Sequence, residues 1–177
     1  MRKNTETMLC IAFMELLGKC PFPKITIQKI AEQCGVNRQT FYYYFDNIYD
    51  LMKKAFEYKL IHESHMYDEP SWESAMRRFL IWMKENRLII KNILSNVESK
   101  YLRQAIYPII YKGMTNEYRP NRIVYVEEGQ MGEFIRHFMA IGITQYVLEW
   151  AESDFKESVD EVIHKLFTIL KKVYQAR

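Results

Sequence analysis

The most distinctive chemistry in the sequence lies in residues 38–44, which read RQTFYYY. A guanidinium group, a carboxamide, a hydroxyl and three phenols stand close together there, and no acidic residue occurs from Gly35 through Phe45. Such groups donate hydrogen bonds to phosphate oxygens, and Arg and Gln also recognise base edges in the major groove. The stretch therefore predicts a surface that contacts nucleic acid.

No other grouping of reactive side chains points to catalysis. The sequence contains no GxSxG, no HExxH, no glycine-rich phosphate loop and no paired-carboxylate motif. His62 and His65 lie about one helical turn apart, but no third ligand accompanies them, so we interpret them as part of a solvated helix face. We expect no enzyme activity, no metal and no cofactor.

Two short helices with a turn between them must position the side chains of residues 38–44. Thr26 is placed to cap a helix over 27–34, and Asn37 is placed to cap a second helix over 38–45. Gly35 suits the left-handed conformation with which helices often end. Two capped helices joined by a short turn that contains glycine indicate a helix-turn-helix.

Apolar residues flank the start of each of these helices. Ile25 and Ile30 bracket the first, and Val36 and Phe41 bracket the second, as hydrophobic staples do. A preceding amphipathic helix over residues 3–19 completes the three-helix core. The side chains of the second helix that remain outside this core are those with hydrogen-bonding groups.

The pattern Thr-x-x-x-Ile-Ala, then Gly-Val, then Thr-Phe-Tyr-x-Tyr-Phe resembles the DNA-binding domain of TetR-family regulators. The resemblance is specific over residues 5–56 and only architectural beyond them. The string NRQTFYYYFDNIYDL is also similar to a subgroup from low-GC Gram-positive bacteria that includes regulators of dihydroxyacetone kinase operons. The resemblance implies a homodimer that binds a palindromic operator on double-stranded DNA, usually as a repressor.

By this resemblance, the second helix is the recognition helix. The implied DNA-binding residues are Thr26, Gln28, Arg38, Gln39, Thr40, Tyr42, Tyr43 and Tyr44. Many members of the family carry a lysine at the start of the next helix, where it anchors a phosphate. This chain has Asp46-Asn47-Ile48 there, so we expect only the backbone amides of that helix to be available for a phosphate.

The rest of the chain also predicts helices, so the expected fold class is all-α. The helices are expected over 47–67 (capped by Asn47, with Asp50 as its box partner), 72–86, 88–97, 100–116 (bent or interrupted near Pro108), 131–152 and 157–174 (capped by Asp154), with a long loop over 118–130. We expect a helix-turn-helix DNA-binding domain over residues 1–50. A helical dimerisation and effector-binding domain is expected over residues 51–177.

The last two helices carry broad apolar stripes that exceed what one small domain needs to cover. Pairing with a second copy would give a four-helix interface, and Gly142 would allow close approach. The residues predicted to form it are Phe134, Phe138, Ile141, Gln145, Val159, Ile163, Leu166 and Leu170. The alternative is that these helices only close the core of their own chain.

Composition and charge agree with a DNA-binding protein of the cytoplasm. The net charge is +3, and residues 1–45 hold six Lys or Arg against three Glu, so the excess lies in the N-terminal part. Three cysteines without a CxxC pattern indicate a reducing compartment, and no apolar run is long enough for a membrane span. We expect a small apolar effector; the alternative is a regulator or activator whose signal comes from a partner protein.

Overall fold

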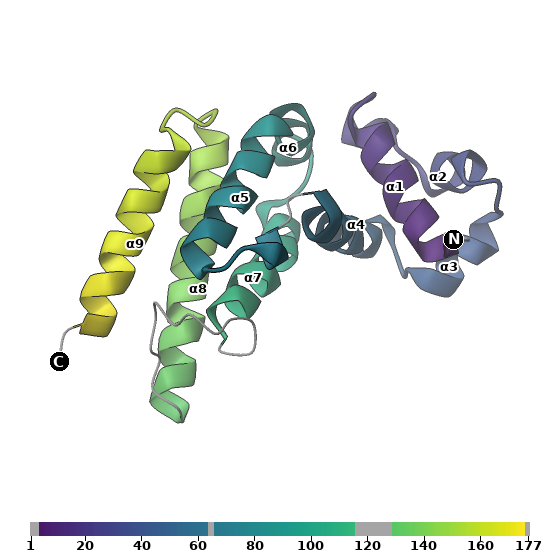
Figure 1. Ribbon diagram of the computed structural model, residues 1–177. Helices are drawn as coiled ribbons and strands as arrows, with labels where there is room; N and C mark the ends of the chain where they lie inside the picture. Colours follow the sequence, from purple (N-terminus) through teal and green to yellow (C-terminus); the bar gives the residue numbers. More distant parts are fainter. Residues whose placement is uncertain (1–3, 64–65, 116–128, 176–177) are drawn as a thin grey trace. The chain divides into compact units, whose positions relative to one another are not determined.

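The computed structural model describes residues 4–63, 66–115 and 129–175, and within them the chain consists of helices without strands (Figure 1). The elements are α1 (Thr5–Leu17), η1 (Phe22–Lys24), α2 (Ile27–Gln33), α3 (Arg38–Tyr44), α4 (Ile48–Glu63), η2 (Met66–Asp68), α5 (Trp72–Glu85), α6 (Arg87–Leu94), α7 (Ser99–Met114), α8 (Gln130–Glu152) and α9 (Val159–Gln175). The all-α prediction is confirmed. Most of the loop expected over 118–130, and His65, lie outside the described residues.

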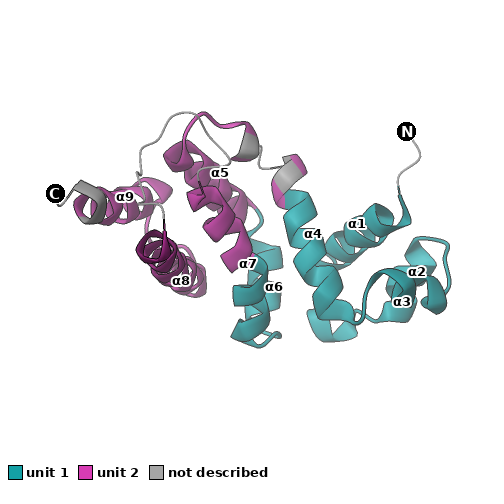
Figure 2. Cartoon of the chain, turned by 90° about the horizontal axis from the view of Figure 1, so that it is seen from below, with its two compact units in different colours: residues 1–59, 86–105 teal, residues 60–85, 106–177 magenta. Residues whose placement is uncertain are grey.

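The chain divides into two compact units (Figure 2). Unit 1 comprises residues 1–59 and 86–105, and unit 2 comprises residues 60–85 and 106–177. The domain boundary expected at residue 50 stays a prediction. Unit 1 contains α6 and the first part of α7 in addition to the helices next to the N-terminus.

The core of unit 1 is formed by side chains that the N-terminal helices turn toward one another. Phe13 of α1, Ile30 of α2 and Phe41 of α3 are all fully buried. Ala31 is also buried, and its small side chain lies where α2 packs against its neighbours. The burial of one face of each helix leaves the opposite face of α3 to solvent, as the apolar spacing predicts.

All three cysteines are free thiols, and each lies in unit 1. Burial, together with the nearby Glu6 carboxylate, raises the pKa of the Cys10 thiol to about 12. Burial also raises the pKa of Cys34, with the Glu15 carboxylate adding to the effect. A thiol whose pKa is raised is a poor nucleophile. The buried Cys10 side chain therefore serves to fill space in the core.

Two details of the helix boundaries in unit 2 differ from the expectation. The helix is not interrupted at Pro108, because α7 continues through this residue, and the next two residues, Ile109 and Ile110, are buried. Helix α9 is capped by Ser158, whose hydroxyl accepts from Glu161 N–H at 3.2 Å while the Glu161 carboxylate accepts from Ser158 N–H at 2.7 Å. The expected cap Asp154 instead lies in the turn before it, with φ 62°.

A close contact between Trp72 of α5 and Gly113 of α7 gives a stability prediction. A Cβ at position 113 would overlap the Trp72 ring, which is 6% exposed and cannot move into solvent. We expect Gly113→Ala to lower the free energy of unfolding by about 1–3 kcal/mol or more, and the melting temperature by about 2–4 °C for each kcal/mol. Thermal unfolding followed by circular dichroism measures the change.

Gly18→Ala is the matched control for this prediction. A Cβ at Gly18 would meet only two carbonyl oxygens, at 3.6 and 3.9 Å, and its φ of −75° is accessible to alanine. We therefore expect Gly18→Ala to leave the melting temperature unchanged or to raise it slightly. Equal melting temperatures for the two variants would contradict the close packing of Trp72 on Gly113.

Candidate nucleic-acid interface

Local hydrogen bonds build the turn between α2 and α3. Thr26 Oγ1 accepts from Lys29 N–H at 3.2 Å, and Asn37 Oδ1 accepts from Thr40 N–H at 2.8 Å, so both expected caps are present. Gly35 has a φ of +68°, in the left-handed region where a side chain would cause strain. These interactions fix the path of the chain from α2 into α3.

Helix α3 buries Phe41 and presents its polar side chains to solvent. Arg38 and Gln39 are exposed, and Tyr42 and Tyr43 are 49% and 81% exposed. Thr40 and Tyr44 are partly buried. The exposure of two large aromatic side chains on one short helix leaves them available for contact with a nucleic acid.

Arg38 and Tyr42 form a pair on the exposed side of α3. The Arg38 guanidinium donates to the Tyr42 hydroxyl at 3.4 Å, and its Cζ lies 6.0 Å from the centre of the Tyr42 ring. The pair lies one helical turn apart, so the helix itself holds the two groups close together. The ring of Tyr43 packs edge-on against Tyr44 at 4.9 Å. These contacts restrict the side chains before any ligand is bound.

The remaining predicted DNA-binding residues are already engaged within the chain. Gln28 of α2 is exposed, and its Nε2 donates to the Glu32 carboxylate at 2.6 Å. The Thr26 hydroxyl serves as the cap of α2, and the Thr40 hydroxyl donates to Asn37 Oδ1 at 3.0 Å. The structure thus brings all eight residues to α2, α3 and the α2 cap. Their contacts with DNA stay predictions.

The start of α4 differs from the expectation that its amides remain available for a phosphate. Asn47 Oδ1 accepts from the N–H groups of Tyr49 and Asp50, at 2.9 and 3.1 Å. The Asp50 carboxylate also accepts from Asp46 N–H at 3.4 Å. The cap expected at Asn47 is thus present, and it occupies the Tyr49 and Asp50 amides, whereas the Asp50 carboxylate occupies the Asp46 amide.

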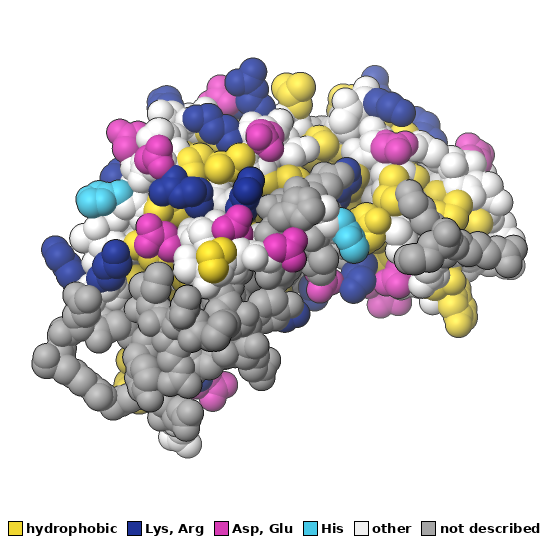
Figure 3. Space-filling view, viewed as in Figure 1, with side chains coloured by type: hydrophobic (Ala, Val, Ile, Leu, Met, Phe, Trp, Pro, Cys, Tyr) yellow, Lys and Arg dark blue, Asp and Glu magenta, His cyan; other side chains and the backbone are white. Residues whose placement is uncertain are grey.

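Charges of both signs are interspersed over the face that Figure 3 shows. Among the described residues, no group of His, Cys, Asp and Glu could hold a metal ion. None of the described helices has the length and apolar composition that a membrane span requires.

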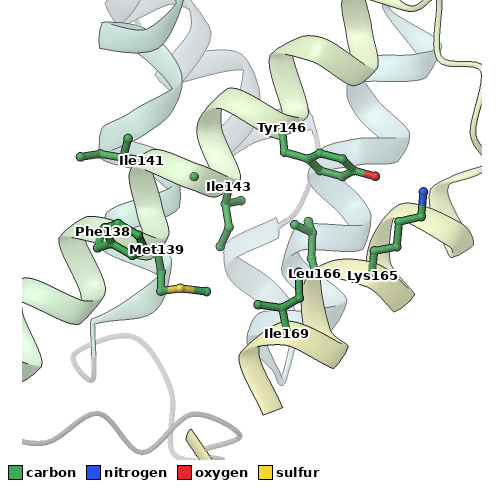
Figure 4. A pocket seen from close by; sticks show the side chains of 9 residues that line it. Phe138, Met139, Ile141, Ile143, Tyr146, Lys165, Leu166 and Ile169 are labelled. Carbon is green, nitrogen blue, oxygen red and sulfur yellow. The ribbon is translucent and has the colours of Figure 1, made fainter. Parts of the chain in front are cut away.

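A second surface of interest lies on α8 and α9 within unit 2, and we call it the α8–α9 groove. It has a volume of about 500 Å³ (Figure 4). The side chains that line it are almost all apolar: Phe138, Met139, Ile141, Gly142, Ile143, Tyr146, Lys165, Leu166 and Ile169. Such an apolar groove on a helical surface is a feature of interaction sites.

The residues predicted to mediate dimerisation divide into two groups. On α8, Phe134, Phe138 and Ile141 are 61%, 64% and 50% exposed, and Gln145 is partly buried. On α9, Val159 is partly buried, whereas Ile163, Leu166 and Leu170 are 2%, 7% and 1% exposed and lie in the core of the chain itself. Among the residues of α9 whose burial is described, the exposed large apolar side chain is that of Ile169, at 53%, which the predicted dimerisation set did not include.

Polar contacts connect α8 to the start of α9 at one end of the groove. The Tyr146 hydroxyl donates to the Glu157 carboxylate at 3.2 Å, and Lys165 forms an ion pair with the same carboxylate. Trp150 Nε1 donates to the Glu157 carbonyl oxygen at 3.0 Å. Figure 4 shows Tyr146 and Lys165 at this end of the groove. Glu157 thus contacts side chains of both helices there.

Sequence reasoning also missed Asn92 of α6, which makes hydrogen bonds to the chain that connects α1 with α2. One signal was present in the sequence. Asn92 is an amide next to Ile93 and within the apolar run of α6, where an unpaired polar group would be costly. A polar residue on the buried side of a helix requires a partner, but the sequence does not say which one.

Comparison with known proteins agrees with this geometry. The family described as bacterial regulatory proteins, tetR family, matches residues 12–55, and the family described as transcriptional regulator C-terminal region matches residues 70–172. The helix-turn-helix and these matches define a DNA-binding transcription regulator. The chain belongs to the TetR family. Both families consist of transcription regulators, so the prediction that the chain is not an enzyme is confirmed.

Individual relatives are similar at low identity. The HTH-type dhaKLM operon transcriptional activator DhaS of Lactococcus lactis is 27% identical over 106 residues, and this match covers 56% of each chain, little more than half. The solved structure of a dihydroxyacetone kinase operon activator DhaS has a TM-score of 0.62 at 18% identity over 97% of each chain. The FadR regulator from Bacillus subtilis in complex with stearoyl-CoA has a TM-score of 0.50 at 17% identity over 92% of this chain and 96% of that one.

Proposed function

We propose that this regulator binds a palindromic operator as a homodimer, through the exposed residues of α3. The observation that carries the dimer is the α8–α9 groove. Its surroundings expose Phe134, Phe138, Ile141 and Ile169, each at least half exposed. Apolar side chains in such number on two adjacent helices favour a partner surface of the same kind, and a twofold axis pairs one patch with its own copy.

A second copy of the chain would cover both the α8–α9 groove and the exposed apolar residues around it. Phe138 and Ile141 project from α8, and together with Leu166 of α9 they line an apolar recess. In a twofold arrangement, the projecting residues of each copy enter the recess of the other. Two recognition helices would then meet major grooves about one turn apart, on the order of 34 Å.

Selection of bound sequences from a random DNA pool, at near-physiological salt, tests the proposal. We expect the purified protein to recover a palindrome whose half-site centres lie one turn apart, and to sediment at twice the chain mass of 21.4 kDa. Affinity for this palindrome is expected to fall steeply with salt, as phosphate contacts require. Recovery of single half-sites by a monomer would contradict the dimer.

The sign of regulation and its signal form a second part of the proposal. Repression released by a small effector is the usual outcome in the family. The similarity to a relative named as an operon activator favours activation as the second candidate, with the signal supplied by an effector or a partner protein. Transcription of a reporter from the selected operator separates the two, because expression falls when a repressor is added and rises when an activator is added.

An effector with a hydrogen-bond acceptor on an apolar body fits one feature of unit 2. The indole N–H of Trp72 is buried and has no hydrogen-bond partner within the described residues. An unsatisfied buried donor costs about 1–3 kcal/mol, so an acceptor brought by a ligand would be favourable there. The buried Trp72 donor therefore supports an effector that acts on unit 2.

We also propose a cytoplasmic location for the whole regulator.

A further inference from the structure

One side chain of α6 holds the connection between α1 and α2. Asn92 Oδ1 accepts from Phe22 N–H at 2.8 Å, and Asn92 Nδ2 donates to the carbonyl oxygens of Leu17 and Cys20, at 2.8 Å each. These backbone groups lie at and beyond the end of α1, where a helix cannot supply partners for all of them. The carboxamide fits in only one orientation. If it were reversed, its NH₂ group would face the Phe22 N–H, and its oxygen would face the two carbonyl oxygens.

A series of stacked rings holds the same connection through its side chains. Phe22 of η1 is 6% exposed and stacks on Tyr49 of α4, with ring centres 5.9 Å apart and planes at 25°. Tyr49 stacks in turn on Tyr101 of α7, at 3.8 Å and 4°. The Lys100 ammonium lies 4.9 Å from the centre of the Tyr101 ring, a distance that allows a cation–π interaction.

These contacts come from segments that are far apart in the sequence but share one unit. Asn92 and Phe22 are separated by 70 residues, and both belong to unit 1 (Figure 2). The connection leads directly into α2, since the buried Ile25 and the cap Thr26 follow Phe22 within four residues. Because α2 and α3 are joined by a short capped turn, a displaced connection would displace α3 with it.

We propose that Asn92 is a positioning residue for DNA recognition. It acts through the α1–α2 connection and does not itself contact DNA. Together with the Phe22–Tyr49–Tyr101 stack, it fixes the orientation of α3 against α6 and the first part of α7, all within unit 1. In a dimer, this orientation determines which separation of operator half-sites is accepted, so the inference rests on the proposed dimer.

Operators of altered spacing test this role. The selected palindrome is compared with versions that carry one base pair more or fewer between the half-sites, which shifts one half-site by about 3.4 Å and about a tenth of a turn. We expect the unmodified protein to bind the altered operators about tenfold or more weakly. For Asn92→Leu, which removes the three hydrogen bonds to the α1–α2 connection, we expect the ratio between the affinities for the original and altered operators to shrink several-fold.

The ratio between the affinities for the original and altered operators distinguishes a positioning role from a general loss of stability. A variant that is only partly folded loses affinity for every operator by the same factor, so its ratio stays that of the unmodified protein. Tyr101→Leu is the second variant and is expected to shrink the ratio as well. Tyr101→Phe keeps the stacked ring and should retain the full ratio.

Hydrogen exchange gives an independent measurement on the protein without DNA. Loss of the Asn92 acceptor is expected to speed exchange of the Phe22 N–H by about tenfold or more, while the amides in the middle of α8 keep their rates. If Asn92→Leu left both the ratio of operator affinities and the exchange rate of the Phe22 N–H unchanged, the positioning role of Asn92 would be contradicted while the proposed dimer would stand. An unmodified protein that is indifferent to half-site spacing would overturn the proposed dimer and this inference with it.

Discussion

Tyr42→Ala is expected to weaken operator binding strongly while leaving the helix-turn-helix folded. The Tyr42 side chain is 49% exposed on α3, where the Arg38 guanidinium holds its hydroxyl in place. A side chain that contacts a base or the DNA backbone contributes about 1–3 kcal/mol, and a dimer loses the contact twice. The expected fall in affinity is therefore about 30-fold or more, measured by fluorescence anisotropy with a labelled operator.

Tyr42→Phe is the matched variant for this prediction. It keeps the ring but removes the hydroxyl that accepts from Arg38. An affinity between those of the unmodified protein and Tyr42→Ala would divide the contribution between the ring and the hydroxyl. Unchanged affinity of Tyr42→Ala, with an unchanged circular dichroism spectrum, would remove Tyr42 from the set of DNA contacts.

Phe138→Glu is expected to prevent the proposed dimer from forming and, through this, to abolish tight operator binding. Phe138 is 64% exposed in a single chain, so the fold should tolerate the charge. At a twofold interface, the variant would bury two carboxylates without partners, which costs several kcal/mol. Analytical ultracentrifugation at micromolar concentration should show a single chain mass, and operator affinity should fall by about 100-fold or more because each copy then binds alone.

Leu88→Glu is the matched control for the change of charge. Leu88 lies on α6 and is 74% exposed, so the variant adds the same carboxylate to an exposed apolar site outside the α8–α9 groove. We expect Leu88→Glu to remain dimeric. If Phe138→Glu also remained dimeric, the two copies would have to meet at a different surface.

The local geometry of the helix-turn-helix was determined by the sequence itself. Thr26 and Asn37 each cap a helix by accepting from the N–H three residues later, and Gly35 takes the left-handed conformation between them. These interactions join near neighbours in the chain. Residue types and spacing were therefore sufficient to predict α2, α3 and the exposed face of α3.

Competition between nearby groups made other local features harder to predict. Position 154 offered an aspartate as a cap for α9, but Ser158 and Glu161 form a reciprocal pair of hydrogen bonds closer to the helix. At the start of α4, the sequence predicts both the Asn47 cap, which is present, and amides available to a phosphate, two of which the cap occupies. Both outcomes depend on which of several possible partners has the better geometry.

Only the tertiary structure decided which side of each long helix faces the core. The apolar stripe of α9 was too broad for its periodicity to separate Ile163 and Leu170, which are buried, from Ile169, which is exposed. The Asn92 contacts join residues 70 to 75 positions apart, and the packing of Trp72 on Gly113 likewise depends on two helices distant in the sequence. Such contacts depend on how the helices pack, and helical periodicity specifies which face of a helix is apolar but not which partner covers it.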